Sequence, residues 1–251
     1  YGFYGLGQWM AANDTEALEQ LNIYGYDPVG AAQLLRENGW RYNATGGAYQ
    51  PGVDAVRYKE MDGTLTPLTI NWAKTSGAGA ALLEEMLTEA AGTLGFQLNI
   101  TEMDFAEMLS HYYRQTDRVY NLYNLATNFH HVFDPYYTYN TDEAYQGVYN
   151  TSGLRDARLQ MRAESLRQVE VGDVETYLER WFSFQQRWVE LMPTVPLYSN
   201  VYFDFFPGDL YGYDINTFWG WGASILSATY TEPVEPAEGE AVNAEDMVTI
   251  P

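Results

Sequence analysis

The chain has 251 residues and 46% hydrophobic content, which is enough to bury the core of one sizeable domain or two small ones. Its 34 acidic and 13 basic residues give a formal net charge of -21, which repels phosphate backbones and acidic membrane surfaces and argues against nucleic-acid binding. No stretch reaches the roughly 18 apolar residues of a transmembrane helix. The absence of cysteine excludes disulfides, thiolate metal sites and cysteine nucleophiles.

Aromatic residues are abundant: 22 Tyr, 11 Phe and 7 Trp make up 16% of the chain. Tyr and Trp combine an apolar ring with a polar group, so a surplus of them suggests a surface that faces a ligand. The alternative is that these rings fill a core and cover an interface. Composition alone leaves both interpretations open.

The beginning of the chain predicts little regular structure before its first long helix. Residues 1–25 are mixed and rich in glycine, and we expect a lead-in segment with one short helix at 14–21. A longer helix is predicted to begin at Pro28, because Asp27 can cap it and proline suits the first helical position. Gly39 is expected to end this helix.

The middle of the chain alternates between strand and helix patterns. Residues 61–63 predict a turn between two short strands. Apolar and polar residues then alternate at 68–72 and again at 96–101, as in strands with one buried face. Between these strands, residues 83–94 carry an apolar stripe at helical spacing, and Thr75-Ser76-Gly77 is the expected cap of that helix.

A further helix and strand complete this pattern. Asp104 is expected to cap a helix, and residues 119–125 predict a third strand. The order strand, helix, strand, helix, strand indicates an α/β fold with a mixed, mostly parallel sheet flanked by helices.

The second half of the chain is more helical. Helices are predicted at 153–168 and 174–191, and Met192-Pro193 is expected to stop the second of them. Residues 195–206 are apolar, β-branched and aromatic, and should enter a sheet. From residue 231 to the end the composition is acidic, without lysine or arginine, which indicates a flexible tail.

The only adjacent histidines, His130-His131, follow the third predicted strand and precede Asp134. Two histidines and a carboxylate can bind a transition metal, but adjacent side chains diverge in most backbone conformations. Hydrogen bonding in a cleft is the better functional interpretation, because ligands of open α/β sheets bind beyond the carboxyl ends of the strands. A solvated loop is the alternative without function.

No catalytic or cofactor motif stands out in the sequence. There is no G-x-S-x-G nucleophile elbow and no glycine-rich phosphate loop, so no cofactor is expected. With 34 acidic residues, a pair of catalytic carboxylates, as in glycosidases, stays open. Two alternatives to a binding protein therefore remain: a carboxylate-dependent hydrolase and an interaction module with an aromatic surface.

The order of short motifs resembles one protein family. Tyr26-Asp27-Pro28, Ala31-Ala32-x-Leu34-Leu35 and Gly39-Trp40 are similar to the Y-D-P-x-x-A-x-x-L-L-x-x-A-G-[WY] signature of extracellular solute-binding protein family 5, the peptide, dipeptide and nickel substrate-binding proteins of ABC transporters. Asp134-Pro135 then follows the third strand, as in the family. The segment Met192-Pro193-Thr194-Val195-Pro196-Leu197-Tyr198 is similar to its A-P-x-I-P-L-Y.

The resemblance covers about residues 26–221 and implies one lobe of a two-lobed protein of the periplasmic-binding-protein-like type II fold. The domain organisation it implies is a lead-in segment at 1–25, an α/β solute-binding lobe at 26–206, a segment returning towards the first lobe at 207–230 and an acidic tail at 231–251.

In function, the resemblance implies the substrate-binding component of an ABC importer, which is not an enzyme. Such a protein captures a small solute or peptide, with an oligopeptide as the expected ligand here, and delivers it to the permease subunits. The implied location is extracellular or at the cell surface, or periplasmic in a Gram-negative organism. Attachment to a membrane, as in a lipoprotein, would use an anchor outside this chain.

The resemblance also places the ligand cleft just after the third strand. Peptide-binding relatives carry a W-x-A-D-Y segment there, and its Asp pairs with the α-amino group of the peptide. In this chain Asn128 stands at the position of that Trp and His131 at the position of that Asp. An imidazole suits a carboxylate or carbonyl better than an ammonium, so acetylated peptides, sugars and other polar solutes stay open. The predicted ligand-binding residues are Trp72, Lys74, Asn128, Phe129, His130 and His131, and no metal site is predicted.

Overall fold

The computed structural model describes residues 2–129, 132–199, 205–214 and 221–231. Backbone contacts divide the chain into two compact units, Tyr1–Leu197 and Tyr198–Pro251. The segment predicted as a lead-in belongs to the first unit.

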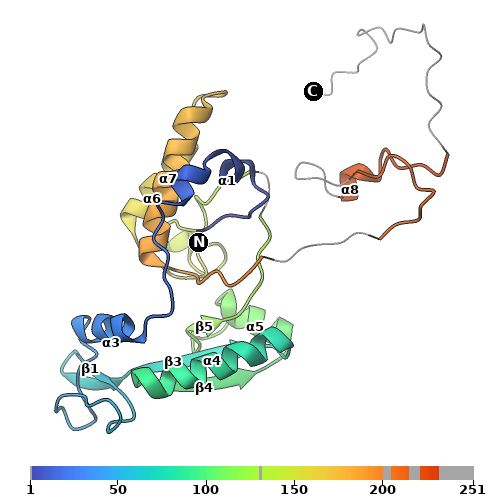
Figure 1. Cartoon of the computed structure of the whole chain (residues 1–251). Helices are drawn as coiled ribbons and strands as arrows, with labels where there is room; N and C mark the ends of the chain where they lie inside the picture. Colours follow the sequence, from blue (N-terminus) through green and yellow to red (C-terminus); the bar gives the residue numbers. More distant parts are fainter. Residues whose placement is uncertain (1, 130–131, 200–204, 215–220, 232–251) are drawn as a thin grey trace, which may run out of the picture. The chain divides into compact units, whose positions relative to one another are not determined.

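A three-stranded parallel sheet organises the first half of this unit (Figure 1). The central strand β3 (Thr69–Lys74) pairs with β4 (Gln97–Glu102) on one side and with β5 (Leu122–Tyr123) on the other. The alternating patterns at 68–72 and 96–101 therefore predicted two strands correctly, and the α/β class with a parallel sheet is confirmed. The third strand is shorter than the predicted range 119–125.

Asn121 explains why β5 can be so short. Its backbone N–H donates to the carbonyl of Asn71, its side-chain Oδ1 accepts from the Asn71 N–H at 2.9 Å, and its Nδ2 donates to the Thr69 carbonyl at 3.3 Å. One residue thus pairs three backbone groups of β3 that lie beyond the reach of β5. Buried or edge backbone groups need such partners.

Two helices connect the strands of the sheet. Helix α4 (Ala78–Leu94) packs along β4 and ends at Gly95, whose φ of 76° is the left-handed conformation of a glycine cap (Figure 1). Asp104 caps α5 (Phe105–Tyr112) by accepting from the Glu107 N–H at 2.9 Å, as predicted.

The beginning and the buried face of α4 differ in detail from prediction. The N-cap is Gly77, the last residue of the predicted capping segment Thr75-Ser76-Gly77, but no side chain forms a capping hydrogen bond. Met86 from the predicted stripe is exposed, whereas Leu83 and Leu87 are half-buried and Ala80 is buried. The buried face of α4 is therefore narrower than the predicted stripe.

A hairpin and a helix precede the sheet. Helix α3 (Pro28–Glu37) begins at the predicted proline, and Asp27 accepts from the Gly30 N–H at 2.8 Å. Strands β1 (Tyr58–Met61) and β2 (Thr64–Pro67) are antiparallel. Their turn places Asp62 and Gly63 at φ of 51° and 77°, the left-handed pair that a two-residue hairpin turn requires.

The second half of the first unit is a helical cluster. Helix α6 (Ala157–Leu166) packs against α7 (Val174–Leu191), and α7 matches its predicted range. Trp181, Phe184 and Trp188 of α7 are buried in the core. The short helices α1 (Trp9–Asn13) and α2 (Thr15–Leu18) contribute Met10 and Ala11, together with neighbouring Leu21, to the same core.

Helix α6 starts four residues later than the predicted range 153–168, because Asn150 organises a loop before it. The Asn150 Nδ2 donates to the carbonyls of Asn140 and Leu154, both at 2.9 Å, and its Oδ1 accepts from the Gly153 N–H at 3.0 Å. Asp156 then caps the helix by accepting from the Leu159 N–H at 2.7 Å.

The predicted strand at 195–206 is wrong for the residues that the structure describes, 195–199 and 205–206, since none of them is in a strand. Val195, Leu197 and Tyr198 are exposed, and Pro196 between them has no N–H to donate to a ladder. The second unit contains α8 (Trp221–Ser224) and a pair of backbone hydrogen bonds between Tyr211 and Thr229. The predicted acidic tail lies outside the described residues from 232 onwards.

Candidate functional site

The carboxyl edge of the parallel sheet is the candidate ligand-binding region. Strands β3, β4 and β5 run in the same direction, so Lys74, Glu102 and Tyr123 end their strands at this one edge. In open α/β sheets this edge is where ligands bind, because the loops that follow the strands converge there. Trp72 and Lys74 of the predicted set lie on β3 itself.

Lys74 is held by two acids at this edge. Its side chain is only 9% exposed, and Nζ lies 2.8 Å from Glu102 Oε2 and 3.2 Å from Glu84 Oε2. Hydrogen bonds to Glu102 and then to Glu84 raise the pKa of Lys74 above its ordinary value. The ammonium therefore links the end of β4 to α4, and its charge is already balanced within the lobe.

Trp72 lies close to the same edge, but its side chain is buried inside the lobe. The residue is 1% exposed, and its Nε1 donates to Asn124 Oδ1 at 3.2 Å. The loop after β5 is thereby fixed to the central strand. The alternation of residues 68–72 already indicated that Trp72 faces the interior.

The segment after β5 carries the other predicted residues. Asn128 is exposed, while Phe129 is half-buried with its ring centroid 5.1 Å from that of Phe3 in an edge-on arrangement. His130 and His131 lie outside the described residues. The structure thus places Trp72 and Lys74 together on β3, and it leaves Asn128 as the accessible member of the set.

Asp134, which follows the histidine pair, is committed to an ion pair. Both of its carboxylate oxygens accept from Arg167, with Nε–Oδ1 at 2.9 Å and Nη2–Oδ2 at 2.5 Å. These hydrogen bonds lower the pKa of Asp134. The Arg167 guanidinium also lies 4.0 Å from the ring centroid of Tyr136. Within the part of the chain that the structure describes, no group of three or more His, Asp or Glu side chains could hold a metal ion.

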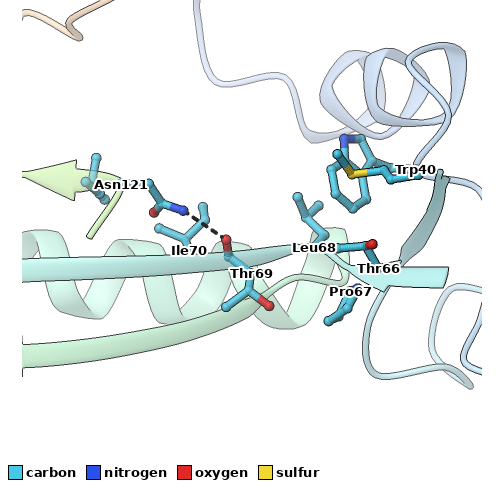
Figure 2. Close-up of a pocket in the computed structure, with 9 residues that line it drawn as sticks. Trp40, Thr66, Pro67, Leu68, Thr69, Ile70 and Asn121 are labelled. Carbon is cyan, nitrogen blue, oxygen red and sulfur yellow. Dashed lines mark hydrogen bonds between the residues drawn. The ribbon is translucent and has the colours of Figure 1, made fainter. Parts of the chain in front are cut away.

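A pocket of about 630 Å³ lies at the other end of the sheet (Figure 2). Leu68 and Ile70 from the amino half of the β3 region form its floor, and the Trp40 ring stands above Leu68. Further lining residues are Met61, Thr66, Pro67, Thr69, Asn121 and Leu122. The Asn121 amide already bonds to β3, so the pocket offers mainly apolar contacts.

Sequence reasoning did not identify this pocket. Trp40 belonged there to the family signature, as the residue after a helix-ending glycine, and Met61 was part of a predicted turn. Neither residue type marks a site by itself, because apolar side chains of hairpins and loops usually pack into cores. The signal that could have indicated the pocket is that Trp40 comes shortly before the hairpin that precedes β3 in the sequence.

Comparison with known proteins gives a likeness in structure and none in sequence. No protein-family model and no curated protein matches the chain. Among the described residues, no helix is long and apolar enough to cross a membrane.

Several solved structures share the arrangement. The oligopeptide-binding protein AppA of Bacillus subtilis, in complex with a nonapeptide, aligns with a TM-score of 0.59 and 12% identity over 77% of this chain and 34% of its own. An oligopeptide-binding protein of Thermus thermophilus, complexed with a pentapeptide, gives 0.55 and 19% over 71% of this chain and 30% of its own.

NikZ of Campylobacter jejuni, in complex with Ni(L-His), gives a TM-score of 0.55 and 15% identity over 77% of this chain and 35% of its own. The chain therefore spans about a third of the length of the structures that it matches. At these identities the likeness concerns the fold: this chain has the α/β fold found in oligopeptide- and nickel-binding solute-binding proteins.

Proposed function

We propose that this chain is one lobe of an extracellular solute-binding protein that captures an oligopeptide and delivers it to the permease of an ABC importer. The observation that carries the proposal is the parallel sheet β4-β3-β5 with its connecting helices, in an arrangement shared with two proteins solved with bound peptides. The protein would act without chemistry, by closing on its ligand.

The proposed cleft residues follow β5 at the carboxyl edge of the sheet. Asn128, Phe129, His130 and His131 are the contact candidates, and an amide and imidazoles suit the carbonyl and carboxylate groups of a peptide. Trp72 and Lys74 have a supporting role in this proposal, because both are buried and already bonded within the lobe. Peptide clefts hold their ligands largely through backbone hydrogen bonds and bridging water.

The described acids with shifted pKa values give no support to a hydrolase. Hydrogen bonds to Arg167 and Arg187 lower the pKa of Asp134 and Asp156, and hydrogen bonds to Thr176 lower that of Asp173. A general acid would instead need a raised pKa in a pocket. Each of these three acids holds a local structure together.

The proposal is tested with the full-length protein in a thermal-shift screen against peptides, acetylated peptides, sugars and a nickel–histidine complex. A ligand that binds only the native state raises the unfolding temperature with concentration. A peptide hit supports the proposal, whereas a sugar or nickel hit would keep the transport role and replace the solute. Turnover of a candidate substrate, or self-association without any ligand, would overturn it in favour of a hydrolase or an interaction module.

The contribution of the cleft is tested by His131→Ala in the same protein. We expect at least about tenfold weaker binding of the peptide hit, with stability changed by less than about 1 kcal/mol, as for a surface substitution. His111→Ala is the matched control, because His111 lies on α5 and bonds to Thr116 outside the proposed cleft segment. Equal affinities in both variants would remove His131 from the site.

A further inference from the structure

Two arginines from the segment between α5 and β5 converge on one glycine. Arg114 and Arg118 lie between the end of α5 and the start of β5, where the chain has returned to the amino end of the strands. A Cβ added to Gly153 would lie 2.0 Å from Arg114 Nη2 and 2.8 Å from Arg118 Nη1. Both guanidinium groups are therefore directed at the same point of the 151–153 loop.

The charges around Arg114 and Arg118 are mainly positive, although the chain as a whole is strongly acidic. Arg118, Arg155 and Glu143 all act on Arg114 electrostatically, and Arg155 forms an ion pair with Glu143. Neither Arg114 nor Arg118 has an ion-pair partner among the described residues. Like charges held together cost free energy, and the cost is relieved when an anion binds between them.

Several donors of the two guanidinium groups are not used by the protein. Arg114 Nη2 donates to the Thr151 carbonyl at 3.3 Å, and Arg118 Nη2 donates to the Ser152 carbonyl at 3.1 Å. The Nε of Arg114 is buried and has no hydrogen-bond partner among the described residues. An orphaned buried donor of this kind is commonly satisfied by water or by an ion.

The backbone at Arg114 has an unfavourable conformation. Arg114 has a φ of 56°, which is unfavourable for a residue with a side chain, and its side chain is approached by Gly147 and Gly153, which also have positive φ. A Cβ on Gly147 would lie 3.3 Å from the Arg114 Cβ and 3.2 Å from the Tyr113 carbonyl. The loop around Arg114 is therefore shaped closely to that residue.

We propose that Arg114 and Arg118 form a binding site for an oxyanion, a carboxylate or phosphate group, separate from the peptide cleft. The forked guanidinium group matches the two oxygens of such a group and binds it more specifically than lysine does. The site would accept this group from a small anion.

The test uses the full-length protein with inorganic phosphate and with acetate as separate probes, each against sodium chloride at equal ionic strength. We expect one of the two anions to raise the unfolding midpoint by about 3 °C at about ten times its dissociation constant. Arg118→Gln is expected to abolish this shift, and Arg118→Lys to reduce it. Arg158→Gln removes an exposed arginine of α6 outside the pair and serves as the control.

The possible results distinguish phosphate from carboxylate as the ligand, and they distinguish this anion site from the proposed peptide cleft. A shift with phosphate alone assigns phosphate, and a shift with acetate alone assigns a carboxylate. His131→Ala should keep the full anion shift, because the proposed cleft lies elsewhere. An anion shift of equal size in Arg118→Gln, or no shift with either anion in the unmodified protein, would overturn the site. Each variant is compared with its own midpoint in chloride, so a change in basal stability does not obscure the result.

Discussion

Gln185 binds both backbone groups of Phe3, although the two residues are separated by almost the whole lobe in sequence. The Phe3 N–H donates to Gln185 Oε1 at 2.7 Å, and Gln185 Nε2 donates to the Phe3 carbonyl at 3.0 Å. Gln185 is fully buried on α7, among the aromatic core residues. Both the N–H and the carbonyl of Phe3 are therefore hydrogen-bonded to the helical core, as the backbone groups of a strand residue are to a neighbouring strand.

Gln185→Leu should destabilise the lobe by about 2–4 kcal/mol, because two partly buried backbone groups of Phe3 lose their partners while the side-chain volume is kept. Urea unfolding monitored by circular dichroism measures the change. Gln168→Leu, at an exposed position, is the control and should change stability by less than about 0.5 kcal/mol. Equal stability of the two variants would show that the pairing with Phe3 contributes nothing.

Tyr139→Phe should cost about 1–3 kcal/mol, because the buried Trp188 Nε1 donates to the Tyr139 hydroxyl at 2.6 Å and would lose its acceptor. Burial raises the pKa of Tyr139 well above its usual value, so this hydroxyl is neutral at neutral pH. Equilibrium unfolding measures the loss. Tyr24→Phe, at an exposed position, is expected to be neutral, and a neutral Tyr139→Phe would contradict the role of this hydrogen bond.

Asp156 should make stability depend on pH in the acidic range. The hydrogen bonds from Arg187 lower the pKa of Asp156 in the folded state, so the carboxylate stabilises the fold fully above about pH 4, the ordinary pKa of Asp. This contribution is lost as pH falls through the lowered folded pKa. Asp156→Asn should therefore weaken the fall in stability below about pH 4.

The two functions of Asp156 can be measured separately. Asparagine keeps an oxygen that can cap α6 and removes the ion pair to Arg187, so Asp156→Asn should cost about 1 kcal/mol at about pH 7. Asp156→Ala removes the cap as well and should cost about 2 kcal/mol. Chemical unfolding at neutral pH and at about pH 3 tests both. Identical pH profiles for the Asn variant and the unmodified protein would exclude the ion pair as the cause.

Asn128 and Trp72 should respond differently, although both belong to the predicted site. Asn128→Ala in the full-length protein should weaken peptide binding and leave the unfolding midpoint unchanged, because its side chain is exposed. Trp72→Ala should cost about 3–5 kcal/mol, because it empties a core position. Calorimetric titration and thermal unfolding separate the two effects. Asn22→Ala is the exposed control, and an unchanged affinity for Asn128→Ala would remove that residue from the cleft.

Helices, strands and turns that are determined by local sequence signals were predictable. The Asp27-Pro28 start of α3, the Asp62-Gly63 turn and the periodicity of α7 are local signals, and the structure shows all three. The length of β5 was not predictable, since it depends on the Asn121 side chain replacing strand residues. The late start of α6 likewise depends on contacts of Asn150 with Asn140, ten residues away.

The site was only partly predictable for a similar physical reason. The order of strands and helices indicated which edge of the sheet collects the loop residues. It did not show that Lys74 would be bonded to Glu84 and Glu102, or that Phe129 would lie against Phe3. These contacts join segments far apart in sequence, and a linear pattern of residue types does not encode them.

The side chain of Asn121 also has a consequence for the behaviour of this lobe at high concentration. An open strand edge is a template for a strand of another molecule, and this is a common route to aggregation. Beyond β5, the groups of β3 that such a strand would need are already paired with the amide and backbone of Asn121. A single residue, through its side chain and its own N–H, therefore closes this part of the sheet to foreign chains without lengthening the strand.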